Sequence, residues 1–474
     1  METPINAPVT SLVNRFNSWI QESIMVKLFS IGFLVLILLI PSAWIDSLIY
    51  ERQQRAEDVI DEISEKWSDS QTLSGPILVI PYTYHEKITK ANNETEVFEK
   101  TENAFFLPET LHVSGTIDPQ TLHRGIFEAV VYGTDLDIKA VFNYPDFKAL
   151  NIPEEMVQWK NAHLIFGITD IGGIRTNPQF TVGDQTPTSE PSNNLGVSIK
   201  KFRKGMHTSY TTDGSNNGDY SNEGIVTKLQ WKEAGDFNGK TSITLSLRGS
   251  ERLNFVPTGK STSVDLKGEW PEPSFDGKFL PDTREVTDTS FAAKWNVLHF
   301  NRPFAQQWTG NGSRLVDSEF GLRLLIPVEQ YQKSIRTSKY SQLIIIFTFV
   351  ALFLVEITRK IRIHPFQYIL IGVALIIYYT LLLSISEQVG YNIAYWIATI
   401  ATVGLVSAYA KTFMKNWSLV ILLTLLMTVF YSFIFVIILQ QDLSLLIGSI
   451  GLFLVVAALM YFSRKVSWYR EPAV

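Results

Sequence analysis

Long apolar runs are confined to two parts of the chain, and their lengths predict membrane-spanning helices. Leu28–Ile45 is predominantly apolar, and its length is close to the lower limit for crossing a hydrocarbon core of about 30 Å. Beyond residue 340 five more apolar stretches follow one another: Ser341–Thr358, Pro365–Leu383, Tyr391–Ala410, Trp417–Leu439 and Leu443–Phe462. We therefore predict six transmembrane helices, one at 28–45 and a five-helix bundle at 341–462.

The long segment between these regions has the pattern of β-strands. Asp135–Ala140 and Ser242–Leu247 alternate polar and apolar residues, as half-buried strands do. Ile77–Ile80 is a short apolar run, which is typical of a buried strand. Asn238-Gly239 predicts a hairpin that joins 229–231 to 243–247. The predicted fold class is a membrane α + β protein whose large, mostly antiparallel β domain, a sandwich or a pair of curled sheets, occupies 46–340.

Helical periodicity is limited to the flanks of this domain. Glu51–Trp67 predicts a juxtamembrane helix that continues from the first span, either a dimerising stalk or, as we prefer, a helix packed on its own domain. Ser11–Glu22 predicts an interfacial helix within the N-terminal segment 1–27; the alternative is an unstructured tail. Pro153–Ala162 predicts one short helix, whereas Thr186–Asn194 and Thr211–Asn222 predict loops.

Basic residues lie on alternate loops of the C-terminal region and predict the orientation. The first and third loops and the tail 463–474 are basic; the second and fourth carry no Lys or Arg. Because basic loops stay in the cytoplasm, we predict that both termini are cytoplasmic and that 46–340 lies on the outer side of the membrane. Arg15 and Lys27 before the first span agree. The basic flank Lys333–Lys339 disagrees. A cleaved signal peptide is the alternative to a retained first helix.

Composition removes several kinds of chemistry. The chain has no cysteine, which excludes disulfides, thiolate catalysis and Cys-ligated metals. Its net charge of −5 gives no basic surplus for nucleic acid. The seven histidines show no metal-ligand spacing. We therefore predict no catalytic, metal-binding or cofactor-binding residues, and no enzyme activity.

Three local features are candidate sites. Ala234–Thr241 fits a loose phosphate-loop pattern, but an alternating strand follows it where a helix is required. Lys200, Lys201, Arg203 and Lys204 form a basic cluster, interpreted as a solvated face rather than an anion site. Glu356 is the one acid inside an apolar stretch; we interpret it as interfacial, paired with Arg359 or Lys360, rather than as a proton relay.

Several ordered segments resemble one known family. Leu253–Pro257 and Trp270–Asp282 with Arg284–Val286 are similar to the external-domain signature of the CreD family of bacterial inner-membrane proteins. His123–Glu128 resembles its Arg-Gly-Ile-Tyr segment, with Phe127 and His123 in place of the commoner residues. Ile363–Pro365, Gln367-Tyr368 and Leu382–Ser384 with Ser386-Glu387 resemble its membrane signature.

The resemblance implies an inner-membrane protein linked to cell-envelope integrity and stress adaptation, and it supplies no catalytic residues. We therefore expect a non-catalytic protein that acts through its periplasmic domain on lipid, peptidoglycan-related material or protein partners. The alternatives are a transporter or flippase for an envelope lipid or amphiphile and, third, an external hydrolase. A groove through the membrane helices would favour transport; a cleft with a histidine and two acids would favour an enzyme. The sequence leaves the oligomeric state open.

Overall fold

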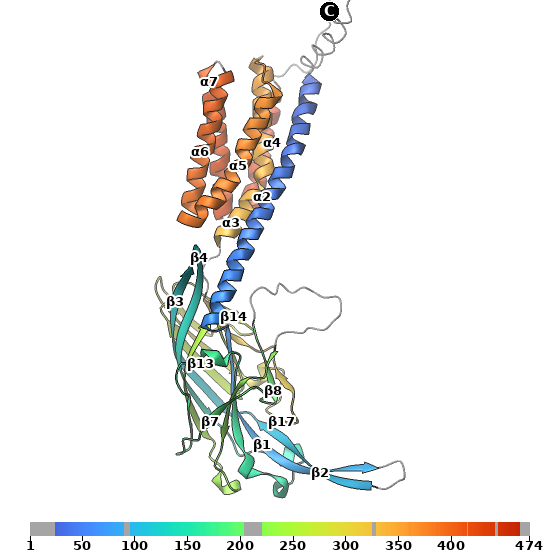
Figure 1. Cartoon of the computed structure of the whole chain (residues 1–474), viewed down its shortest axis with the longest axis vertical. Helices are drawn as coiled ribbons and strands as arrows, with labels where there is room; N and C mark the ends of the chain where they lie inside the picture. The colour runs from blue at the N-terminus through green and yellow to red at the C-terminus, as the bar shows by residue number, and fades with distance from the viewer. Residues whose placement is uncertain are drawn as a thin grey trace, which may run out of the picture. The chain divides into compact units, whose positions relative to one another are not determined.

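The computed structural model describes residues 24–89, 95–202, 220–324, 329–359, 361–414, 416–440 and 444–464 (Figure 1). The chain forms two compact units. Met1–Arg55 and Pro327–Val474 make up the first, here called the membrane unit, and Ala56–Ile326 make up the second, the β unit. The predicted interfacial helix at 11–22 lies outside the described residues.

Helices form the membrane unit, and their labels follow Figure 1. They are α2 (Ile24–Trp67), whose last part belongs to the β unit, α3 (Glu329–Lys339), α4 (Ser341–Arg359), α5 (Pro365–Val389), α6 (Tyr391–Phe413), α7 (Trp417–Leu439) and α8 (Ser444–Ser463). Buried tyrosines occupy the core of this bundle, where the Tyr395 hydroxyl donates to the Tyr431 carbonyl oxygen at 2.7 Å.

The prediction of six spans is wrong by one for the part of the chain that is described. Five helices are long and apolar enough to cross a membrane: Met25–Trp67, Tyr331–Arg359, Pro365–Val389, Tyr391–Phe413 and Trp417–Leu439. The predicted sixth stretch is helical as α8 (Ser444–Ser463), and Leu446–Ala457 within it is a shorter apolar segment.

The β unit contains three sheets. The nine-stranded sheet consists of β14 (Pro273–Gly277), β19 (Phe320–Leu324), β12 (Arg252–Val256), β1 (Gln71–Thr89), β5 (His163–Ile168), β10 (Gly224–Lys228) and β7 (Ser189–Ser192) in this order, with β2 (Thr95–Phe106) and β17 (Gln307–Thr309) off the path. The seven-stranded sheet has the order β15 (Thr283–Val286), β16 (Phe291–Leu298), β13 (Ser261–Gly268), β3 (Thr110–Arg124), β4 (Phe127–Val141), β11 (Lys240–Ser250) and β6 (Gln179–Val182). The small sheet consists of β18 (Ser313–Leu315), β8 (Val197–Lys200) and β9 (Tyr220–Ser221).

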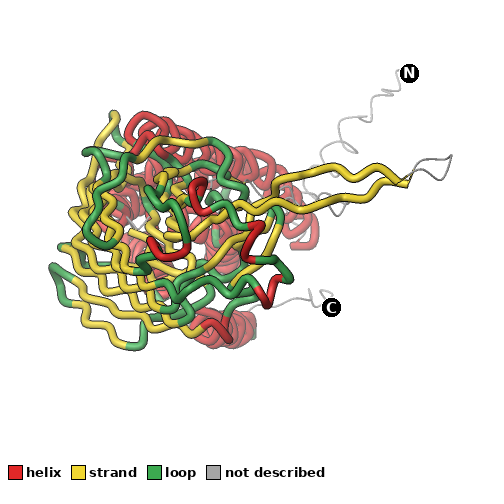
Figure 2. Tube along the Cα trace, turned by 90° about the horizontal axis from the view of Figure 1, so that it is seen from below, coloured by secondary structure: helices red, strands yellow, loops and turns green. Residues whose placement is uncertain are grey.

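The main core lies between the two large sheets, and alternate residues of β1 supply two cores. Leu78 and Ile80 belong to the same buried cluster as Val113 and Leu266 of the seven-stranded sheet. Ile77 and Val79, on the other face of β1, instead pack with residues of the small sheet. A strand buried on both faces needs a continuous apolar run, which explains Ile77–Ile80. The β1–β2 hairpin extends away from the rest of the β unit (Figure 2).

Most strand pairs of the β unit are antiparallel, as predicted, although the sheets are mixed, because β1–β12, β3–β13 and β8–β18 pair in parallel. The structure corrects three other expectations. Asn238-Gly239 does not close a hairpin: β11 pairs with β4 and β6, while β10 lies in the other sheet. Glycine is required at position 239 because of close packing: a Cβ there would lie 2.0 Å from the Phe142 carbonyl oxygen. The predicted loop 186–194 contains β7, and 153–162 forms two 3₁₀ turns rather than one helix.

Candidate functional site

An open groove of about 630 Å³ lies on the solvent-facing side of the seven-stranded sheet. Burial alternates along its strands, as in β16, so that every second side chain points away from the core. Six strands contribute to the groove: Ser114–Thr116, Asp135–Asp137, Thr244, Asp265–Lys267, Thr283–Glu285 and Ala292–Lys294 line it. The groove therefore runs across the sheet, from the edge strand β15 towards β11.

The groove carries mixed charge and small side chains. Ser114 and Ala292 leave space between longer neighbours. Asp265 lies beside Ser114 and Lys294 in the strand ladders, and its Oδ1 is 3.5 Å from Lys294 Nζ. The acidic lining residues are Asp135, Asp137, Asp265 and Glu285, and the basic ones are Lys267, Arg284 and Lys294. Such a surface offers hydrogen-bond donors, acceptors and both signs of charge to a polar partner.

A histidine, a serine and an aspartate meet near one end of this groove. His112 Nδ1 is 2.6 Å from Ser263 Oγ, and its Nε2 is 3.9 Å from Asp265 Oδ2. In Ser-His-Asp hydrolases the carboxylate accepts a hydrogen bond from the second ring nitrogen and holds the imidazole, but 3.9 Å is too long for that bond. The His112 side chain is also 43% exposed, which is a poor setting for activating a serine.

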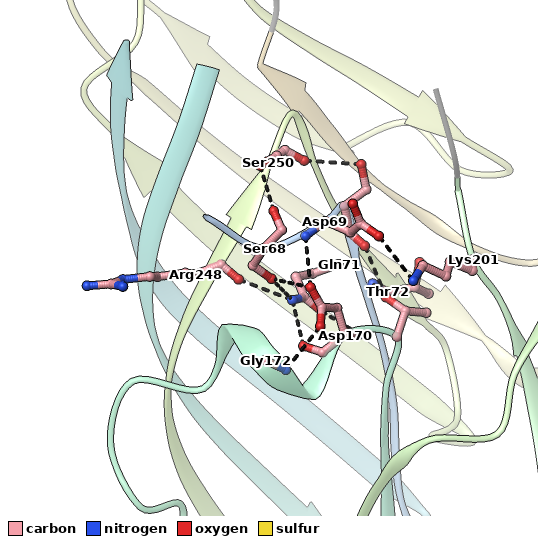
Figure 3. A network of polar contacts seen from close by, with 11 residues as sticks. Ser68, Asp69, Gln71, Thr72, Asp170, Gly172, Lys201, Arg248 and Ser250 are labelled. Atoms are coloured by element: carbon pink, nitrogen blue, oxygen red, sulfur yellow. Dashed lines mark hydrogen bonds and ion pairs between the residues drawn. The ribbon is translucent and has the colours of Figure 1, made fainter. Parts of the chain in front are cut away.

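Buried polar contacts fix the start of β1, a few residues after the end of α2 (Figure 3). Gln71 is fully buried, and its Nε2 donates to the carbonyl oxygens of Asp170 and Arg248 at 2.9 and 3.1 Å. Asp170 Oδ2 accepts from Ser68 Oγ at 2.7 Å and from the Asp69 backbone N–H at 2.9 Å. These contacts hold the end of α2 against β11 and against the turn that follows β5, within the same β unit.

Close packing reinforces this junction. A Cβ on Gly173 would lie 2.5 Å from the Arg248 carbonyl oxygen and 2.6 Å from Ser68 Oγ. The Arg248 guanidinium lies over the Trp67 ring at 4.5 Å, and Arg124 forms an ion pair with Glu62. The charged end of α2 therefore packs on its own domain, as preferred over a dimerising stalk. Sequence analysis missed Gln71 and Asp170, because isolated polar residues beside an apolar run resemble ordinary turn residues.

The basic cluster at 200–204 is divided by the fold. Lys201 Nζ lies 3.1 Å from Asp69 Oδ2 (Figure 3), and Lys200 Nζ lies over the Phe202 ring at 5.1 Å. Residues 203 and 204 lie outside the described part of the chain. At 234–241 a 3₁₀ turn precedes β11, so a strand follows where a phosphate loop requires a helix, as predicted.

The membrane unit holds Glu356 in a different way from that expected. Its side chain is 2% exposed, and its Oε1 lies 2.7 Å from Lys27 Nζ of α2. Its Oε2 accepts from the Tyr368 hydroxyl at 3.0 Å. The predicted pairing with Arg359 is wrong among the described residues, and Lys360 lies outside them. The reason is that Glu356 faces α2 and α5 in the bundle, whereas Arg359 at the end of α4 is exposed.

Comparisons with known proteins agree on one family. The family model described as "Inner membrane protein CreD" matches residues 23–469. The chain is also 30% identical over 447 residues to "Inner membrane protein CreD" of Escherichia coli (strain K12), covering 94% of this chain and 93% of that protein.

The fold and these matches identify the class of the protein. It is a multi-pass protein of the inner membrane, with a large mixed β-sheet domain between its N-terminal apolar helix and the apolar helices that follow. The chain belongs to the CreD family.

Proposed function

We propose that this protein maintains the integrity of the cell envelope, or its adaptation to stress, as a non-catalytic protein that acts through its β unit in the periplasm. The observation that carries the proposal is the groove of about 630 Å³ on the seven-stranded sheet. Its hydroxyl, carboxylate and amino groups favour a glycan or peptide of the envelope over a lipid chain.

The groove hypothesis is tested by filling the groove. Ala292 is exposed on β16 and lines the groove, so Ala292→Trp blocks it without altering the core. Ser261→Trp is the matched control, because Ser261 is exposed on the same sheet outside the groove. In a strain that lacks the gene, we expect wild type and Ser261→Trp, but not Ala292→Trp, to restore growth under envelope stress. Equal complementation by both variants at equal abundance would contradict the proposal.

The proposed absence of catalysis has its own test. Ser263→Ala and His112→Gln remove the contact of 2.6 Å between these side chains. We expect both variants to complement the deletion as well as wild type does, because neither residue lines the groove. Loss of complementation by both, with normal abundance, would instead favour a hydrolase.

The proposal also requires both termini in the cytoplasm and the β unit in the periplasm. The alternation of basic loops supports this orientation, with Arg362 in the first predicted loop and Lys411 and Lys415 in the third. A protease-sensitive tag inserted near residue 216 should be cleaved in spheroplasts, and one after Val474 should be protected. The reverse pattern would overturn the envelope assignment.

A transporter or flippase of an envelope lipid or amphiphile is the second candidate. The observation in its favour is Glu356, an acid held between helices of the membrane unit. Its contacts with Lys27 and Tyr368 favour a structural ion pair over a relay. Scrambling of fluorescent lipids in proteoliposomes separates the two: we expect a rate no higher than that of empty vesicles.

A further inference from the structure

A cavity of about 510 Å³ lies within the membrane unit beside the ion pair of Lys27 and Glu356. Its walls come from α2, from Glu356 of α4, from the segment that joins α4 to α5, and from the first turn of α5. One side is apolar, because Ile31 and Leu34 of α2 line it. The segment between α4 and α5 contributes two polar side chains, Arg362 and His364, beside Ile363 and Pro365.

The acid in this cavity already has its partners. Glu356 Oε1 lies 2.7 Å from Lys27 Nζ and 3.4 Å from the Ile363 backbone nitrogen, and its Oε2 accepts from the Tyr368 hydroxyl at 3.0 Å. Lys27 and Glu356 together therefore add no net charge. The side chain of Glu356 is left with little capacity for a further cation.

Arg362 supplies the charge that remains. Its side chain is exposed at the cavity, and no carboxylate of the described residues lies within 4 Å of its guanidinium. The guanidinium is positively charged at every relevant pH and presents a planar set of donors that suits phosphate. The cavity lining therefore carries a net positive charge, which is contributed by the segment between α4 and α5.

His364 adds a donor to the same wall. It is the N-cap of α5, where its Nδ1 accepts from the Phe366 backbone N–H at 3.2 Å. A neutral imidazole that accepts at Nδ1 carries its proton on Nε2. His364 thus has an N–H group that the helix cap does not use.

We propose that this cavity binds one anionic phospholipid, whose phosphate contacts Arg362 and His364 and whose acyl chain lies along Ile31 and Leu34. Charge complementarity selects an anionic headgroup, because basic pockets between transmembrane helices bind such lipids. The apolar wall selects a lipid over free phosphate, because a soluble ion leaves that wall uncovered. The inference is independent of the proposed function, which concerns the β unit.

Native mass spectrometry of the full-length protein, titrated in detergent with lipids of matched acyl chains, tests the site. We expect phosphatidylglycerol to bind several-fold more tightly than phosphatidylethanolamine. Arg362→Gln should weaken phosphatidylglycerol binding about fivefold, since one basic residue near a membrane surface contributes about 1 kcal/mol. The matched control is Arg359→Gln, which removes the same charge from an exposed residue outside the cavity and should change binding less than twofold.

A second variant and a soluble competitor complete the experiment. His364→Asn keeps an acceptor for the helix cap, but its shorter side chain withdraws the N–H donor from the position of Nε2, and it should weaken phosphatidylglycerol binding about twofold. Glycerol phosphate should not displace the lipid at equal concentration. Each variant should have a melting temperature within about 2 °C of wild type, which shows that it is folded. Equal binding of the two lipids, equal loss with Arg359→Gln, or displacement by glycerol phosphate would overturn the proposal.

Discussion

Each unit holds a carboxylate where distant segments meet, but the two carboxylates are stabilised differently. In the β unit Asp170 accepts hydrogen bonds from neutral donors: the Ser68 hydroxyl and the backbone N–H groups of Asp69 and Gly172. In the membrane unit Glu356 has a cation, Lys27, at 2.7 Å, in addition to the Tyr368 hydroxyl. A carboxylate is therefore stabilised by neutral hydrogen-bond donors in the β unit and by a cation in the membrane unit.

The difference follows from the surroundings. Asp170 is only partly buried, so water and neutral dipoles stabilise its charge. Glu356 lies in a bundle of apolar helices, where an unpaired charge is costly and a counter-ion is needed. The contacts around Asp170 therefore depend on correctly placed neutral donors, whereas the contacts around Glu356 depend on a balancing positive charge.

Replacing Gln71, which bonds to the backbone of Asp170 and Arg248, should have the largest effect on the stability of the β unit. Gln71→Met deletes the donor to two backbone carbonyls and the acceptor for the Asp170 N–H. Leaving buried polar groups without partners should lower the free energy of unfolding by about 3 kcal/mol. Thr72→Val is the control, because the Thr72 hydroxyl has no partner among the described residues; it should be neutral. Proteolysis of the β unit against denaturant measures both, and equal effects would refute this role of Gln71.

Breaking the ion pair of the membrane unit should have the next largest effect. Lys27→Met leaves Glu356 buried without its cation, and we expect a loss of about 2 kcal/mol, less than for a fully buried pair because Lys27 is 29% exposed. The double variant Lys27→Met/Glu356→Met should recover most of this loss. Melting temperatures in detergent measure the set. An additive loss in the double variant would show that charge balance is not the cause.

A steric change at the β-unit junction should have a smaller effect. Gly173→Ala places a Cβ 2.5 Å from the Arg248 carbonyl oxygen, and overpacking of this kind costs about 1–2 kcal/mol. Gly172→Ala is the matched control, because the nearest atom to its Cβ is Asp170 Oδ1 at 3.1 Å. The denaturation midpoint of the β unit should fall more for Gly173→Ala. Equal midpoints would show that the junction tolerates movement.

The smallest expected effect is a pH dependence of the β unit. Burial lowers the pKa of His163, and the charge of Lys228 lowers it further, against a hydrogen bond with the Asn161 carbonyl. Its stabilising contribution is therefore complete above the unfolded pKa of about 6.5 and is lost as the pH falls through the lower folded pKa. His163→Gln should flatten the decline of stability below pH 6.5. A decline as steep as in wild type would assign it to other groups.

Sequence patterns predicted elements better than they predicted pairing. Apolar length identified α4 to α7, because each must cross the same hydrocarbon core. Alternation identified β4 and β11, and these strands do pair. The prediction of a hairpin at Asn238-Gly239 was wrong, because turn-forming residues do not show which sheet the next strand joins. The parallel pairing of β3 with β13 joins strands far apart in the sequence and leaves no local signal.

The sites show the same limit. Glu356 was recognised because an acid in an apolar run is unusual, but its partner Lys27 is distant in sequence and only the fold brings them together. The exposed groove residues Thr116, Asp135 and Lys267 lie at ordinary solvent-facing positions of alternating strands. The space between them depends on the register of six strands, which no single segment specifies.

Helix α2 runs without interruption from Ile24 to Trp67, and it enters the β unit at Ala56. The membrane part of this helix contains Pro41, which has no backbone N–H group. The carbonyl oxygen of Ile37, one turn earlier, therefore lacks its usual helical donor, and Pro41→Ala would supply that donor without adding a bulkier side chain.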